Sequence, residues 1–382
     1  MGLGEAITHR ESSPSSVAPL GRCVRIGILY LVFSIYQMLG AAAYAAPFAY
    51  VTNAGSGNVS VINMATNAVI TTVAVGLTPE QVAITPNGLL AYVSNPGSNT
   101  VSVIATATNT VIATIFVGTG PAGVAITPDG AFVYVANSGS NTVSVIATAT
   151  NTVTATIFVG TGPAGVAITP NGLSAYVANF VSNTVSVIAT ATNTVTATIV
   201  VGTGPAGVAI TPDGAFVYVA NSGSNTVSVI ATATNTVIAT IFVGTGPAGV
   251  AITPNGLSAY VANFVSNTVS VIATATNTVT TTISVGQRPD FLAVSLNGVS
   301  VFVPNQNSNT VSVISTASNT VTATISVGVS PTGVATTPST TPIIPTLSDG
   351  ALLLLLAAMA AALALRIVPR QASAPPRPPR AL

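Results

Sequence analysis

Side chains able to do chemistry are scarce in this 382-residue sequence, and their types limit the reactions it can support. Between residues 48 and 338 there is no His, Cys or Lys, which excludes a Ser/His/Asp triad, a thiolate nucleophile and an imidazole metal site. The charged side chains of this stretch are Glu80, Asp129, Asp213, Arg288 and Asp290. We therefore expect a protein that is not an enzyme and that uses no cofactor.

Two of the acidic residues, Glu80 and Asp290, hold equivalent positions directly after a Pro. Arg288 and a polar Asn-Gln-Asn segment belong to the same region of the repeats described below. Such groups can hold a small polar molecule, and carboxylate and amide oxygens can also bind a cation. We expect one ligand sector made of Glu80, Arg288, Asp290, Asn305 and Asn307. The alternative is that the terminal repeats have diverged while adapting to each other.

Two aromatic residues, Phe180 and Phe264, each replace a Ser in an otherwise polar Asn-Ser-Gly-Ser-Asn loop. An exposed aromatic side chain at a loop tip can anchor a partner. Packing of the ring against the adjoining loop is the alternative. Asp129 and Asp213 occupy Pro-Asp-Gly turns where other copies have Asn, which favours a role in the turn.

Charge is sparse throughout, because only 4% of the residues are charged and 49% are hydrophobic. A typical soluble domain carries about a quarter charged residues. With a net charge of +1, the chain has no basic face to neutralise phosphates, which argues against nucleic-acid binding.

These residues are positioned by a repeat of 42 residues. The pattern Tyr-Val-x-Asn and its variant Phe-Val-Pro-Asn begin at residues 50, 92, 134, 176, 218, 260 and 302. Residues 121–204 and 205–288 are more similar still and differ at five positions. Those differences are Thr154/Ile238, Ala197/Thr281, Val200/Ser284, Thr203/Gln287 and Gly204/Arg288.

Within one repeat, four runs of alternating β-branched and small residues are separated by Pro-Asp-Gly and Asn-rich turns. This predicts an all-β fold, a seven-bladed β-propeller with four-stranded antiparallel blades. Residues 48–77 lack a first strand, whereas residues 331–338 form a first strand with no second strand after it. We expect this C-terminal strand to join the N-terminal blade and close the ring. A linear β-solenoid is the alternative.

The segments PAGVAITPDG (residues 121–130) and YVANSGSNTVSVI (residues 134–146) resemble YVTN family β-propeller repeats. The resemblance covers residues 48–338. It implies a seven-bladed propeller on an exported protein and implies no known catalytic activity.

The two ends carry patterns typical of targeting. Basic, apolar and small residues follow one another in residues 1–45, as in a signal peptide, although an uncleaved anchor helix is the alternative. Near the other end, residues 339–350 form a Pro/Thr linker with the motif Ile344, Pro345, Thr346 and Leu347. A hydrophobic helix is expected over residues 351–365 and a basic, Pro-rich tail over 366–382. This end resembles an IPTL-CTERM sorting segment, with a simple membrane anchor as the alternative.

Together these patterns predict a non-enzymatic, exported β-propeller that serves as a structural or adhesion module at the cell surface or outer membrane of a Gram-negative bacterium. The alternative is a periplasmic or surface propeller that binds a small ligand or a cation. The expected partners are the export and C-terminal sorting machinery, glycans or surface proteins, and the membrane through the C-terminal helix.

Overall fold

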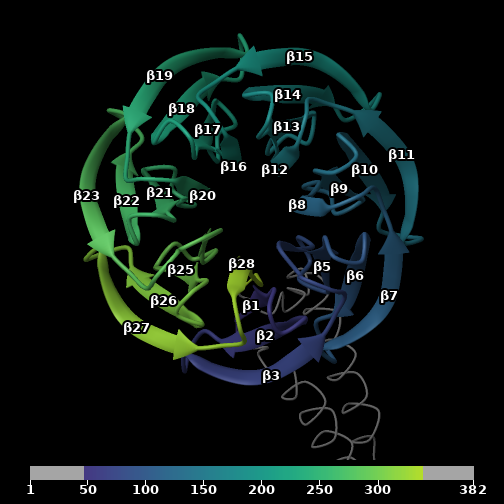
Figure 1. Cartoon of the computed structure of the whole chain (residues 1–382), viewed down its shortest axis with the longest axis vertical. Helices are drawn as coiled ribbons and strands as arrows, with labels where there is room; N and C mark the ends of the chain where they lie inside the picture. The colour runs from purple at the N-terminus through teal and green to yellow at the C-terminus, as the bar shows by residue number, and fades with distance from the viewer. Residues whose placement is uncertain (1–46, 339–382) are drawn as a thin grey trace, which may run out of the picture. The chain divides into compact units, whose positions relative to one another are not determined.

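Seven four-stranded antiparallel sheets surround a central axis in residues 47–338, the part of the chain that this computed structural model describes (Figure 1). The fold confirms the seven-bladed propeller. The expected signal peptide (1–45), linker and Ile-Pro-Thr-Leu motif (339–350), hydrophobic helix (351–365) and tail (366–382) lie outside the described residues. Within residues 47–338 there is no helix of the length and apolarity needed to span a membrane.

The blades are numbered in chain order, and their strands are given from the axis outward. Blades 1 to 3 are β28 (Pro331–Thr336), β1 (Phe48–Asn53), β2 (Asn58–Asn63), β3 (Ala68–Ala74); β4 (Val82–Ile84), β5 (Leu90–Asn95), β6 (Thr100–Ala105), β7 (Thr110–Phe116); and β8 (Pro121–Ile126), β9 (Phe132–Asn137), β10 (Thr142–Ala147), β11 (Thr152–Phe158). Blades 4 and 5 are β12 (Pro163–Ile168), β13 (Ser174–Asn179), β14 (Thr184–Ala189), β15 (Thr194–Val200); and β16 (Pro205–Ile210), β17 (Phe216–Asn221), β18 (Thr226–Ala231), β19 (Thr236–Phe242). Blades 6 and 7 are β20 (Pro247–Ile252), β21 (Ser258–Asn263), β22 (Thr268–Ala273), β23 (Thr278–Ser284); and β24 (Ala293–Val294), β25 (Ser300–Asn305), β26 (Thr310–Ser315), β27 (Thr320–Ser326).

The hydrophobic core lies between neighbouring blades. In one of seven such clusters, Tyr134 and Val145 of blade 3 pack against Val177 and Ile188 of blade 4. The second and third strands are buried on both faces, whereas most residues of the outer strand are exposed. Burial of both faces explains why these strands contain few charged residues.

A repeated hydrogen bond connects each blade to the next. The Tyr134 hydroxyl in β9 donates to Asn193 Oδ1 at 2.7 Å, and Asn193 sits in a turn with φ +55°. Equivalent bonds start from Tyr50, Tyr92, Tyr176, Tyr218 and Tyr260. Blade 7 has Phe302 at this position, so the contact between blades 7 and 1 lacks the bond.

The C-terminal strand closes the ring, as predicted. β28 pairs antiparallel with β1, with Val334 opposite Val51 and Ala335 opposite Tyr50. Figure 1 shows the yellow C-terminal strand beside the purple N-terminal ones. Because β28 occupies the inner edge of β1, that edge is not left open, and a linear solenoid is excluded.

The innermost strands differ in length. Five of them have six residues and carry Gly at the third position, where an added Cβ would meet the backbone of the next blade; at Gly123 it would collide with the Ala164 carbonyl oxygen. Blades 2 and 7 carry Gln81 and Phe291 at this position. Their inner strands have only three and two residues, because a side chain there does not fit the close backbone packing.

Candidate functional site

The closing strand brings Glu80 and Asp290 to the same part of the ring. Glu80 precedes β4 and Asp290 precedes β24, so the two residues belong to the blades on either side of β28. The Glu80 carbonyl oxygen accepts hydrogen bonds from Thr52 Oγ1 at 2.7 Å and Thr332 Oγ1 at 2.9 Å. On the other side, the amide of Phe291 donates to the Thr332 carbonyl oxygen at 3.0 Å. The backbone at both acidic residues is therefore held by β28.

The two carboxyl groups have unusual acidities. Both residues are half-buried, and burial raises the pKa of Glu80 to about 7. Burial, together with the negative charge of Glu80, raises the pKa of Asp290 to about 8. Both pKa values therefore lie well above the ordinary range of carboxyl groups and close to neutral pH. The negative charge of Glu80 opposes ionisation of Asp290, so the two carboxyl groups lose their protons one after the other.

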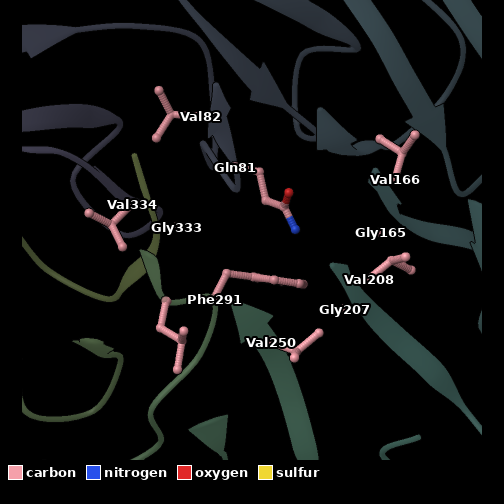
Figure 2. A pocket seen from close by; sticks show the side chains of 11 residues that line it. Gln81, Val82, Gly165, Val166, Gly207, Val208, Val250, Phe291, Gly333 and Val334 are labelled. Atoms are coloured by element: carbon pink, nitrogen blue, oxygen red, sulfur yellow. The ribbon is translucent and has the colours of Figure 1, made fainter. Parts of the chain in front are cut away.

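A cavity of about 150 Å³ lies at the centre of the ring. Figure 2 shows Gln81 of blade 2 and Phe291 of blade 7 projecting into it. Its other walls are small: glycines and valines of blades 4, 5, 6 and 1 together with Val82 and Leu292. Gln81 and Phe291 directly follow Glu80 and Asp290, so the segments that carry the two carboxyl groups also contribute to the cavity, although neither carboxyl group lines it.

Gln81 and Phe291 were missed as functional residues from the sequence. The available signal was their position, since the other five blades have Gly there: Gly123, Gly165, Gly207, Gly249 and Gly333. A large side chain at a position otherwise restricted to Gly indicates a local change of backbone.

The structure separates the other residues of the expected ligand sector from the carboxyl pair. Arg288 and Asn307 line a different pocket of about 290 Å³, which they share with Phe264. Asn305 joins neither group, because its side chain is fully buried in blade 7 and donates from Nδ2 to Ser312 Oγ at 2.9 Å. An Asn held inside the blade cannot take part in a ligand sector with Glu80 and Asp290.

The other residues singled out in the described part of the sequence lie in loops and turns away from the central cavity. Phe180 is 46% exposed, and its ring lies over Gly204, where an added Cβ would come within 3.3 Å of it. Asp129 accepts hydrogen bonds from Thr127 Oγ1 and the Ala131 amide, which lower its pKa and give it the role in the turn that the sequence favours; Asp213 repeats this arrangement. The motif Ile344 to Leu347 lies outside the described residues.

Among residues 47–338 there is no cluster of three or more His, Cys, Asp or Glu side chains that could hold a metal ion.

Two family models match the sequence. The family described as "Lactonase, 7-bladed beta-propeller" matches residues 43–158 and 85–198, and the "Choice-of-anchor I domain" matches residues 160–339. No curated protein matches the sequence. With seven four-stranded blades closed into a ring, the chain is a β-propeller repeat protein.

Solved structures share this fold. Hydrazine synthase of Kuenenia stuttgartiensis is 26% identical, with a TM-score of 0.65 over 70% of this chain and 92% of that one. Proteins assigned as 6-phosphogluconolactonases from Bacteroides uniformis ATCC 8492 and Bacteroides fragilis NCTC 9343 are each 17% identical, with TM-scores of 0.67 and 0.66. They cover 76% and 78% of this chain and 99% of their own length.

The lactonase family match, with lactonase-named neighbours of the same fold, overturns the expectation that the protein is not an enzyme. That expectation relied on the absence of His, Cys and Lys from residues 48–338. It did not include the effect of burial on carboxyl groups, which raises the pKa of Glu80 to about 7 and that of Asp290 to about 8.

Proposed function

We propose that the propeller binds a small cyclic ester at the central cavity and hydrolyses it, with Glu80 as the base and Asp290 as the acid. The observation that carries this proposal is that the segments bearing Glu80 and Asp290 also supply Gln81 and Phe291 to the cavity, while the pKa values of the two carboxyl groups are raised to about 7 and about 8. Two titratable groups with separated pKa values supply an acid and a base at one pH. The match to a lactonase family supports an ester as the substrate class.

The reaction balances with water as the only co-reactant. The Glu80 carboxylate accepts a proton from water while the water oxygen bonds to the ester carbonyl carbon. Asp290 donates its proton to the ring oxygen as the carbon–oxygen bond of the ring breaks, which yields a hydroxy acid. The proton on Glu80 then returns to Asp290 through solvent. Gln81 projects an amide into the cavity, where it can bind polar substrate groups, and Phe291 offers an apolar surface.

The test measures hydrolysis of glucono-δ-lactone by the purified protein in a pH-stat, above the spontaneous rate. Glu80→Gln and Asp290→Asn should each lower kcat/KM by about 10²–10⁴-fold, because each removes one proton-transfer group. Asp129→Asn is the matched control: it also neutralises an Asp, yet other blades have Asn in that turn, so the activity should be retained. Thermal melting confirms that each variant is folded. Absence of hydrolysis by the wild-type protein, or full activity of both carboxyl variants, would overturn the proposal.

We further propose that the protein acts outside the cytoplasm, attached to the cell surface or outer membrane. The signal-like order of residues 1–45 and the sorting-like segment from Ile344 support this, as does the match to a domain family whose name refers to an anchor. Adhesion to glycans or surface proteins through the exposed Phe180 loop is part of the same proposal. Cell fractionation with surface proteolysis tests it: protection of the propeller in intact cells, with recovery in the cytoplasmic fraction, would contradict it.

A further inference from the structure

Arg288 and Phe264, two residues singled out in the sequence, lie together in a pocket on the loops of the propeller. The guanidinium carbon of Arg288 lies 5.1 Å from the centroid of the Phe264 ring. The pocket has a volume of about 290 Å³ and is lined by Phe264, Val265, Asn267, Gln287, Arg288 and Asn307. It is formed by loops of blades 6 and 7 and shares no lining residue with the central cavity.

Arg288 is held in a backbone conformation that usually belongs to Gly. Its φ is +54°, and all the equivalent residues also have positive φ: those of blades 3 to 6, among them Gly204, are glycines with φ between +61° and +65°, and those of blades 2 and 1 are Thr78 (+51°) and Ser330 (+56°). The Arg288 amide donates to Asn267 Oδ1 at 2.8 Å, and the Gln306 amide donates to the Arg288 carbonyl oxygen at 2.9 Å. The repeat therefore sets the backbone conformation at this position, and in blade 7 it presents a guanidinium there.

The charge of Arg288 has no carboxylate partner in its surroundings. Arg288 is the one basic residue of residues 48–338, and within the described part of the chain no Asp or Glu lies within ion-pair distance of it. A guanidinium over an aromatic face keeps its in-plane N–H groups free to bind a carboxylate with two parallel hydrogen bonds. The pocket thus presents an unneutralised site for an anion.

The other lining residues indicate what the anion carries. Gln287 and Asn307 provide amide donors and acceptors, which suit hydroxyl groups. Val265, which is 62% exposed, and Phe264 provide an apolar wall that suits the C–H face of a sugar ring. We propose that this pocket binds an acidic sugar, with its carboxylate on Arg288 and its hydroxyls on the two amides. The proposal goes beyond the hydrolytic function and does not depend on it.

The chain contains a near-identical pocket position that lacks the binding groups. Around Phe180, Thr203 and Gly204 stand where Gln287 and Arg288 stand around Phe264. Gly223 takes the place of Asn307, since Gly223 and Asn307 make the equivalent backbone bonds to Thr203 and Gln287. This position keeps the aromatic ring but has no guanidinium and neither of the two amides, so we expect no binding there.

The test is titration of the purified protein with D-glucuronate, with D-glucose and acetate as comparison ligands. Glucuronate should bind the wild-type protein. Glucose and acetate should each bind roughly tenfold or more weakly, because glucose lacks the carboxylate and acetate lacks the sugar hydroxyls. Arg288→Gly should weaken glucuronate binding by a similar factor while the protein stays folded, because Gly is the native residue at this position in other blades.

A transplant gives a second, positive readout. Thr203→Gln, Gly204→Arg and Gly223→Asn, introduced together into the Arg288→Gly protein, should restore glucuronate binding at the Phe180 position. No binding of glucuronate to the wild-type protein, equal binding by Arg288→Gly, or equal affinity for glucose or acetate would each overturn the proposal. A transplant that folds, as judged by thermal melting, and does not bind would also count against it. Activity toward glucono-δ-lactone, measured in parallel, should be unchanged by Arg288→Gly.

Discussion

At the scale of single residues, Glu80 and Asp290 show how position changes the chemistry of an ordinary side chain. Four middle blades have Ala at the equivalent positions, and only the blades on either side of β28 have a carboxyl group there. Burial raises both pKa values, and ionisation of Glu80 makes loss of the Asp290 proton harder still. In the proposed reaction Glu80 is therefore the base and Asp290 the acid.

This assignment predicts a bell-shaped dependence of kcat/KM on pH. The rate should rise as Glu80 loses its proton near pH 7 and fall as Asp290 loses its proton near pH 8, with a maximum at about 7.5. The residual activity of Glu80→Gln should lose the rise on the acidic side, and that of Asp290→Asn should lose the fall on the alkaline side. Initial rates from pH 5 to 10, corrected for spontaneous hydrolysis, provide the measurement; a flat wild-type profile would contradict the assignment.

At the scale of elements, the blades are joined by Tyr-to-Asn hydrogen bonds, which six of the seven contacts between blades contain. The exception is the contact between blades 7 and 1, where Phe302 replaces Tyr and Asn67 occupies the corresponding turn with φ +54°. The sequence shows the substitution, but the partner of each Tyr lies 59 residues further along the chain and became apparent only in the folded ring.

We predict that Phe302→Tyr stabilises the protein. The new hydroxyl should donate to Asn67 Oδ1 and raise the free energy of unfolding by about 0.5–1.5 kcal/mol, the usual net value of such a bond. The reverse change, Tyr134→Phe, should lower it by a similar amount. Denaturant titration measures both, and Asn67→Ala should abolish the gain from Phe302→Tyr. A gain that persists in the Asn67→Ala background would show that the hydroxyl acts elsewhere.

At the scale of the whole molecule, one strand both closes the ring and builds the site. β28 covers the inner edge of β1, and its Thr332 lies between the segments that carry Glu80 and Asp290. Loss of this strand would expose an edge and remove the hydrogen bonds from Thr332 to the Glu80 carbonyl oxygen and from the Phe291 amide to Thr332. Closure and the proposed activity therefore depend on the same residues.

Two truncations separate the closing strand from the segment that follows it. A chain ending at residue 328 should melt at a lower temperature and less cooperatively than the full chain, and should lose lactone hydrolysis. A chain ending at residue 338 keeps β28 and should melt and react like the full chain. Calorimetry and the pH-stat assay compare the two; equal melting curves would contradict closure through β28.

The sequence by itself determined the number of blades, the order of their strands and the closure by residues 331–338, because alternation, turn residues and the 42-residue period are local patterns that repeat. It also pointed to Glu80 and Asp290 as equivalent residues. Only the tertiary structure decided which side chains meet: Arg288 and Asn307 joined Phe264, and Asn305 was buried within its blade. Contacts between blades depend on how the ring packs, and pKa values depend on burial. Neither is contained in the spacing of residues along the chain.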